Sequence, residues 1–252
     1  MAIYVTGDIH GNPNRFSYDN FPVQKELTKD DYVIILGDFG MIWSGDNDEH
    51  EKLDWLNERS FTTLFIDGNH ENFDLLSLYP IVDYHGGKAH KIRDNIYHLM
   101  RGYIFDIDGK KFFAFGGAKS HDIRDGVLDP NNYNSIQQFY EAYNRMRSSG
   151  KVFRVNGISW WKQEIPDEFE MERGINSLKK VNNTVDFVIA HCAPQSIASI
   201  MGYPDRDKLT VYFDDLIVDG LKFDKFYFGH YHRDEQVLGR FICMYERIVQ
   251  IA

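Results

Sequence analysis

The sequence places short clusters of metal-binding side-chain types directly after apolar, β-branched runs, and it does so five times. The clusters are Gly7-Asp8-Ile9-His10-Gly11, Gly37-Asp38-Phe39-Gly40, Gly68-Asn69-His70-Glu71, Ala190-His191-Cys192 and Gly229-His230-Tyr231-His232. Runs that are nearly continuous in Val, Ile and Phe are typical of strands buried on both faces. Side chains that follow such strands gather at the carboxyl edge of an α/β sheet. The pattern therefore predicts an α/β fold whose distant loops meet at one site.

The strands and helices can be placed from the apolar pattern. Six buried strands are predicted at residues 3–6, 32–36, 63–66, 111–115, 185–190 and 225–228, and helices at 49–59 and 162–180. Residues 97–100, 103–107 and 240–251 have the character of antiparallel strands, and Asp108-Gly109 is the expected hairpin turn. The predicted architecture is a two-sheet β-sandwich flanked by helices.

Length and composition favour one domain over residues 1–252, because 43% apolar residues can fill a substantial core. Residues 118–161 differ from their surroundings, being rich in Asn, Ser, Tyr and Arg, with a turn signal at Asp129-Pro130-Asn131-Asn132. We expect this segment to be an insertion near the mouth of the site, with a helix at residues 135–147.

Charge and cysteine content restrict the partners and the compartment. The formal net charge of -10 counts against a broad nucleic-acid-binding surface, although bound cations would reverse the potential inside a cleft. No run approaches the roughly 18 apolar residues of a membrane span, and the start lacks the features of a signal peptide. Cys192 and Cys243 lie far apart, which disfavours a disulfide framework and fits the cytoplasm. The oligomeric state is not predicted.

The first two clusters offer carboxylate and imidazole ligands. Asp8 and His10 stand two residues apart, so on an extended chain both side chains point the same way and both could bind one ion. Asp38 could bridge two ions through its separate oxygens. Each residue also has an ordinary interpretation, since Asp8 could form a turn, His10 could be a surface imidazole and Asp38 could cap a helix.

The remaining clusters add an amide and more imidazoles. Asn69 offers a neutral oxygen, and His70 beside it could donate a proton to a substrate. His191 could be a ligand or a satisfied core histidine. His230 and His232 flank one residue at strand spacing, which suits a metal, and the alternative is a pair of exposed edge histidines.

Taken in this order, the five clusters resemble the calcineurin-like metallophosphoesterase superfamily across nearly the whole chain. The resemblance implies a four-layer fold with helices outside two sheets. It implies two metals, the first held by Asp8, His10, Asp38 and His232, and the second held by Asp38, Asn69, His191 and His230. It also implies that His70 is the catalytic histidine.

The chain departs from the protein-phosphatase members of that superfamily after the second cluster. Those members carry an Asp that supports the catalytic histidine and an Arg that grips phosphate, whereas Met41 and Ile42 stand here. A protein-phosphatase activity is therefore disfavoured. His121 and Arg124 could supply charge to the substrate, or could be ordinary surface residues.

Aromatic residues of the 118–161 segment allow two interpretations. They could stack a ring of the substrate, but helix-like spacing, as between Phe139 and Tyr143, favours a small satellite core. The residues concerned are Tyr133, Phe139, Tyr140, Tyr143, Trp160 and Trp161.

The expected activity is hydrolysis of a phosphoester, in which a hydroxide held between two divalent ions attacks phosphorus and His70 protonates the leaving oxygen. Manganese is the first expectation, with iron or zinc as alternatives. The substrate is expected to be a phosphodiester or a nucleotide. A phosphomonoester and a non-catalytic metal-binding scaffold of the same fold remain the alternatives.

Overall fold

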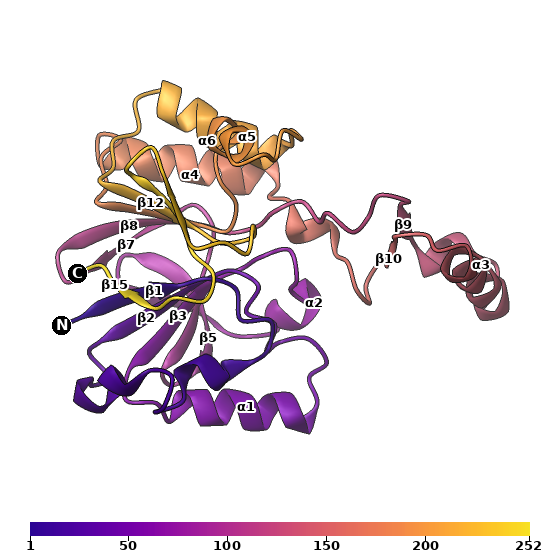
Figure 1. The fold of residues 1–252 in the computed structure, drawn as a ribbon, viewed down its shortest axis with the longest axis horizontal. Coiled ribbons are helices and arrows are strands. Elements are labelled where there is room, and N and C mark those ends of the chain that lie inside the picture. The colour runs from indigo at the N-terminus through magenta and orange to yellow at the C-terminus, as the bar shows by residue number, and fades with distance from the viewer.

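The computed structural model describes residues 1–252 and contains two stacked β-sheets with helices on both outer faces (Figure 1). The first sheet has seven strands, in the spatial order β15 (Val249–Gln250), β1 (Ile3–Thr6), β2 (Tyr32–Leu36), β3 (Thr62–Ile66), β6 (Ile96–Leu99), β5 (Gly87–Arg93) and β4 (Ile81–Tyr84). The second has six, in the order β13 (Glu235–Val237), β14 (Phe241–Cys243), β12 (Lys225–Phe228), β11 (Phe187–Ala190), β8 (Lys110–Phe115) and β7 (Tyr103–Ile107).

The central strands of both sheets are parallel. In the first sheet β1, β2, β3 and β6 run parallel, and in the second β8, β11, β12 and β14 do so. Antiparallel strands lie at the edges, at β15, β5 and β4 of the first sheet and at β13 and β7 of the second. The two mixed sheets and their helices confirm the predicted sandwich.

Alternate residues of each central strand serve two different cores, which explains the continuous apolar runs. In β2, Ile34 and Leu36 face the second sheet and pack in a cluster with Phe112 and Ile189. Val33 belongs to another cluster on the opposite face, under the outer segments of the first sheet. Strands buried on both faces cannot show polar alternation.

Helices cover the outer faces. α1 (Asn47–Asn57) covers the first sheet and begins at the Asp46 cap, whose side chain accepts from the Glu49 amide. The second sheet is covered by α4 (Glu168–Lys180), α5 (Gln195–Ile200) and α6 (Lys208–Val218) (Figure 1). Every helix falls short of the length and apolar character that a membrane crossing requires.

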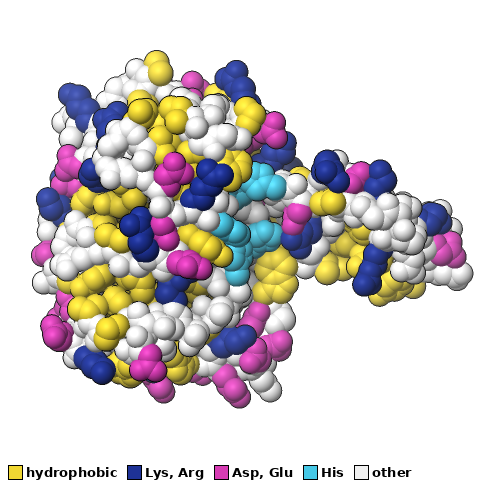
Figure 2. Space-filling model, in the orientation of Figure 1, with side chains coloured by type: hydrophobic (Ala, Val, Ile, Leu, Met, Phe, Trp, Pro, Cys, Tyr) yellow, Lys and Arg dark blue, Asp and Glu magenta, His cyan; other side chains and the backbone are white.

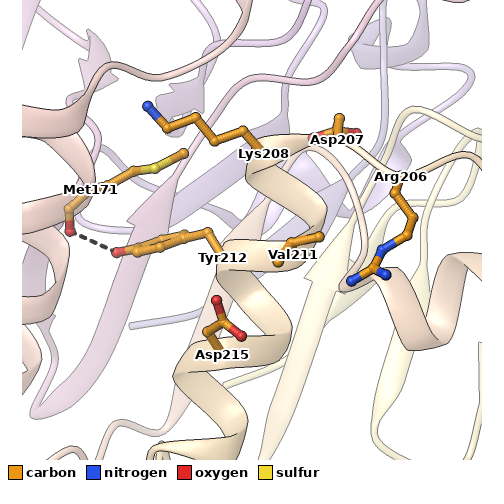
Figure 3. A pocket seen from close by; sticks show the side chains of 7 residues that line it. All are labelled: Met171, Arg206, Asp207, Lys208, Val211, Tyr212 and Asp215. Atoms are coloured by element: carbon orange, nitrogen blue, oxygen red, sulfur yellow. Dashed lines mark hydrogen bonds between the residues drawn. The ribbon is translucent and has the colours of Figure 1, made fainter.

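Helices α4 and α6 are joined by a side-chain hydrogen bond. The Tyr212 hydroxyl donates to the Met171 carbonyl at 3.0 Å, beside a surface hollow (Figure 3). None of the residues that line this hollow belongs to the five polar clusters. The bond therefore fixes α4 and α6 relative to each other in the outer helical layer.

The predicted elements at 240–251 and 162–180 need correction. Residues 240–251 form two strands and not one: β14 pairs antiparallel with β13 and parallel with β12, and β15 pairs antiparallel with β1 in the other sheet. The Asp234 carboxylate accepts the amides of residues 245–247, which bends the chain between the two strands. The helix predicted at 162–180 begins only at Glu168, after Pro166 and the capping box of Asp167.

Two local predictions are confirmed. Asp108 and Gly109 form the two-residue turn between β7 and β8, and both have positive φ, as a type I′ hairpin requires. The helix predicted at 135–147 is α3 (Ile136–Ser148), which begins at the Ser135 cap.

Residues 118–161 extend away from the two sheets, and we call this segment the arm (Figure 1). It contains α3 and a small parallel ladder of β9 (Val127–Leu128) and β10 (Arg154–Val155). Figure 1 shows α3 at its far end, while both ends of the arm join the body beside the carboxyl edge of the sheets.

A buried ion pair links the loop after β3 to the loop after β6. The Arg101 guanidinium is 3% exposed and binds both the Asp67 carboxylate, with Nε at 2.7 Å from Oδ2, and Glu170 of α4. His98 lies 3.0 Å from the other Asp67 oxygen. Burial alone disfavours the Asp67 carboxylate, but Arg101 and His98 outweigh it and hold the Asp67 pKa well below its usual range. Asp67 therefore stays charged beneath the loop that carries Asn69.

Replacing Arg101 with Met should lower the free energy of unfolding by about 3–5 kcal/mol, because the Asp67 charge would stay buried without its main partner. Urea denaturation of the two proteins measures this loss. Lys52→Met is the control, since its ion pair with Asp48 is exposed and should change stability little. Equal midpoints for Arg101→Met and the unmodified protein would show that the pair does not stabilise the fold.

Candidate metal centre

All five polar clusters lie at the carboxyl ends of the central parallel strands. Asp8 follows β1, Asp38 follows β2 and Asn69 follows β3 in the first sheet. His191 follows β11 and His230 follows β12 in the second sheet. Because the parallel strands of the two stacked sheets end at the same edge, loops far apart in sequence meet there.

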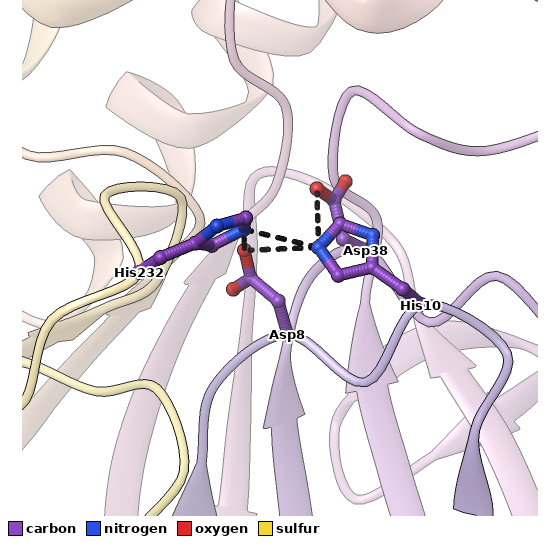
Figure 4. A group of neighbouring side chains, drawn as sticks. All are labelled: Asp8, His10, Asp38 and His232. Atoms are coloured by element: carbon purple, nitrogen blue, oxygen red, sulfur yellow. Dashed lines mark hydrogen bonds and ion pairs between the residues drawn. The ribbon is translucent and has the colours of Figure 1, made fainter.

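Four side chains form the first group of potential ligands. One ligand atom from each of Asp8, His10, Asp38 and His232 lies within 4.8 Å of the others. Figure 4 shows His10 and His232 pointing toward each other from two loops, with the carboxylates between and behind them. Their Nε2 atoms are 3.0 Å apart, and His232 Nε2 is 3.1 Å from Asp8 Oδ2.

A second group adjoins the first through Asp38. His191 Nε2 lies 3.4 Å from Asp38 Oδ1 and 3.2 Å from Asn69 Oδ1. The rings of His191 and His230 are 5.1 Å apart, and the His230 amide donates to Asp8 Oδ1 at 3.1 Å. All seven predicted ligand residues thus converge, and Asp38 is the residue that faces both groups.

The tautomer of His191 suits a metal ligand. Its Nδ1 lies 2.7 Å from the Leu36 carbonyl, a contact that requires Nδ1 to carry the proton and donate. Nε2 is then directed at Asn69 and Asp38. A metal-binding imidazole usually donates its other ring N–H to a backbone carbonyl or a similar acceptor, because this hydrogen bond fixes the orientation of the ring.

The backbone at the site takes conformations that side-chain-bearing residues rarely adopt. His10, Asp38, His230 and His232 all have positive φ, between 44° and 68°. Such left-handed residues cluster at functional sites, where the surrounding structure holds them. Position 68, next to Asn69, has no room for a side chain, because a Cβ on Gly68 would overlap the Asp38 carboxylate.

Electrostatics at the site favour a cation. Burial disfavours the Asp38 carboxylate, but the imidazoles of His191, His70 and His10 outweigh it and hold the Asp38 pKa well below its usual range. Burial also disfavours protonated His191, yet Asp38 and Asp8 outweigh this and raise the His191 pKa. Metal binding would displace that proton, because a ligating imidazole is neutral.

The donor set also fits a divalent ion. Asp8 Oδ2 is buried, and although His232 Nε2 lies 3.1 Å away, no donor is oriented to form a hydrogen bond with it. Carboxylate, imidazole and amide donors together suit borderline ions such as manganese, iron or zinc better than calcium.

His70 lies beside the first group of potential ligands. Its amide donates to Asp38 Oδ1 at 2.8 Å, and its ring is 5.7 Å from the His10 ring. The imidazole itself makes no hydrogen bond, and it is half-buried. Met41 and Ile42, which replace the Asp and Arg of protein phosphatases, are buried in the apolar cluster outside the first sheet. Neither position supplies a polar group to the site.

Glu71 supports the Asp38 loop, a role that the sequence did not reveal. Its carboxyl group accepts the Phe39 amide at 2.7 Å and the Gly40 amide at 3.4 Å. Burial, with Asp38 adding to it, raises the Glu71 pKa to about 8. The only sequence signal was its place directly after His70.

The arm contributes residues that sequence reasoning missed. Asn69 Nδ2 donates to Ser120 Oγ at 3.3 Å, and Ser120 in turn donates to the buried Glu164 carboxylate at 2.5 Å. Ser120 lies at the start of the arm and Glu164 lies just after its end. No motif distinguishes either residue. Together they hold the Asn69 amide so that its oxygen faces His191.

The two substrate-contact candidates in the arm, His121 and Arg124, both lie beside the site. The His121 ring stacks on the His230 ring at 4.5 Å and 26°. The Arg124 side chain is 76% exposed. Both residues line a cavity of about 620 Å³ beside His230.

The remaining aromatics divide into two groups. Phe139 is buried within 6.3 Å of the rings of Tyr133, Tyr140 and Tyr143, which gives the arm its satellite core. Trp161 is buried elsewhere, against Trp43 at 5.3 Å.

Comparison with known proteins identifies the family of the chain. No curated protein matches the chain. A family model described as calcineurin-like phosphoesterase matches residues 1–234, which include all five polar clusters. The chain therefore belongs to the calcineurin-like phosphoesterase family and is a metal-dependent phosphoester hydrolase.

Proposed function

We propose that the protein uses two divalent ions to hydrolyse a phosphodiester or a nucleotide. The observation that carries this proposal is the position of Asp38, whose Oδ2 lies 3.9 Å from His10 and whose Oδ1 lies 3.4 Å from His191. A carboxylate between two sets of donors can bind an ion with each oxygen. The first ion would be held by Asp8, His10, Asp38 and His232, and the second by Asp38, Asn69, His191 and His230.

The chemistry divides between the ions and the chain. When bound, two such cations activate water and offset the charge of a phosphoryl group, and manganese is our first candidate. His70 would donate a proton to the leaving oxygen, because its imidazole is free of internal hydrogen bonds and lies beside the ligands. The Asp38 carboxylate accepts the His70 amide and so fixes that residue relative to the first ion.

The missing phosphate-gripping Arg supports a diester. Ile42 stands at that position and is 4% exposed. A diester carries less charge than a monoester dianion, so it needs fewer cationic groups beyond the metals. The phosphomonoester and the non-catalytic scaffold remain the alternatives, and retention of every expected ligand argues against the scaffold.

The two cysteines support a reducing compartment. Cys192 and Cys243 are free, buried thiols. We place the protein in a reducing environment such as the cytoplasm.

Replacing His70 with Ala should slow turnover by about 10²- to 10⁴-fold while both metals stay bound, because the change removes the proton donor and no ligand. Turnover of a chromogenic ester and metal content by elemental analysis are measured on the same sample. His50→Ala, an exposed histidine of α1, is the matched control and should keep full activity. Unchanged turnover of metal-loaded His70→Ala would refute this role.

The protein should hydrolyse bis-para-nitrophenyl phosphate faster than para-nitrophenyl phosphate when manganese is supplied, because the site lacks the extra cation that a monoester dianion needs. Initial rates on both esters test this. A strong preference for the monoester would reverse the substrate assignment, and no manganese-stimulated hydrolysis of either ester would favour the scaffold.

Replacing Ser120 with Ala should weaken manganese binding by about 10- to 100-fold at one of the two sites, because Asn69 loses the group that orients its amide. Titration of free manganese by electron paramagnetic resonance gives both affinities without any turnover. Ser148→Ala, at the far end of α3, is the control. Two unchanged affinities in Ser120→Ala would show that Asn69 needs no such support.

A further inference from the structure

The arm carries charge of the opposite sign to the rest of the chain. Residues 118–161 contain six Lys and Arg against four Asp and Glu, whereas all other residues contain 22 against 34. Figure 2 shows histidines gathered where the arm leaves the body, with Lys and Arg side chains farther along it. The arm is therefore the part of this acidic molecule best suited to an anion.

A groove of about 870 Å³ runs along the arm between α3 and the segment that returns to the body. Arg147, Lys151 and Arg154 line it, and Asp122 is the one acidic residue among the lining side chains. Lys151 also pairs with Asp125, which lies outside the lining, at 2.9 Å. This volume lies within the range of roughly 300–1,000 Å³ usual for ligand sites. Several cations in one groove suit a ligand with several phosphates better than one with a single phosphate.

Aromatic side chains line the groove together with these cations. Phe139 and Tyr143 pack within the arm, and Tyr143 meets Phe153 at 5.3 Å. Tyr140 lines the same groove but is 56% exposed, so part of its ring is open to a ligand. An open ring beside basic side chains is the arrangement with which proteins bind single-stranded nucleic acid.

Three consecutive residues at the start of the arm connect the groove with the metal centre. Consecutive residues at the start of the arm reach both places: Ser120 binds Asn69, the His121 ring stacks on His230, and Asp122 lines the groove. Asp122 Oδ2 accepts from Arg154 Nε at 2.8 Å, which holds that cation at the site end. Asp122 Oδ1 is buried and accepts no hydrogen bond.

We propose that the groove of the arm binds a short single-stranded oligonucleotide whose scissile phosphodiester lies at the metal centre. This inference rests on the proposed phosphodiesterase activity and names its substrate class. Arg147, Lys151 and Arg154 would bind successive phosphates, and Tyr140 would stack on a base. The acidic body explains why binding is confined to the groove rather than spread over a surface.

Binding is tested without catalysis, on full-length protein in a chelator, by fluorescence anisotropy with a labelled oligothymidylate of about six nucleotides. The double variant Arg147→Ala/Lys151→Ala should bind more weakly. Its affinity should also depend less on salt: the negative slope of log affinity against log salt should become shallower by about 1 for each phosphate that the variant no longer binds. Tyr140→Leu should lower affinity about fivefold or more, and Tyr140→Phe should restore it. Arg145→Ala is the matched control, because Arg145 also belongs to α3 but does not line the groove.

Two further measurements separate this inference from the proposed activity. All groove variants should hydrolyse bis-para-nitrophenyl phosphate at the unmodified rate, since that ester is too small to occupy the groove and the metal centre together. No binding of the oligonucleotide, or an equal drop in affinity in Arg145→Ala and in the groove variants, would overturn the groove. A concentration-dependent dimer that the groove substitutions abolish would show that a second copy of the chain occupies it instead. Failure of the unmodified protein on the small diester, with oligonucleotide still bound, would overturn only the activity.

Discussion

The Asp38 carboxylate is the interaction on which the rest of the site depends. One oxygen faces His10 and the other faces His191, so this single side chain joins the two groups of donors. The same carboxylate accepts the His70 amide. Its backbone is in the left-handed region, and Glu71 holds the two amides that follow it. The protein thus fixes a strained, charged residue from several directions at once, as preorganised sites require.

The sandwich explains how so many distant residues reach Asp38. Parallel strands of two stacked sheets end at a common edge, so β1, β2 and β3 deliver Asp8, Asp38 and Asn69 while β11 and β12 deliver His191 and His230. The inner faces of both sheets form one apolar cluster, which holds the two halves of the site in register. The arm then adds Ser120 and His121, which contact Asn69 and His230.

The sequence predicted the central strands well, because each strand is buried on both faces and forms an unbroken apolar run. The predicted strands 3–6 and 32–36 match the bounds of β1 and β2 to the residue. It missed β4 and β5, whose Lys, His and Asp residues conceal the pattern. The eight candidate site residues could be proposed from the sequence because their clusters are local. Ser120, Glu164 and Arg101 were not, because each acts through a partner more than 30 residues away, in a segment without a motif.

A binuclear centre requires two ions that share one carboxylate, and a crystal structure of manganese-loaded protein with anomalous scattering tests this most directly. Two anomalous peaks about 3.5–4 Å apart, with Asp38 bound to both, are the predicted result. A single fully occupied peak under saturating manganese, or two peaks that share no ligand, would contradict the binuclear centre.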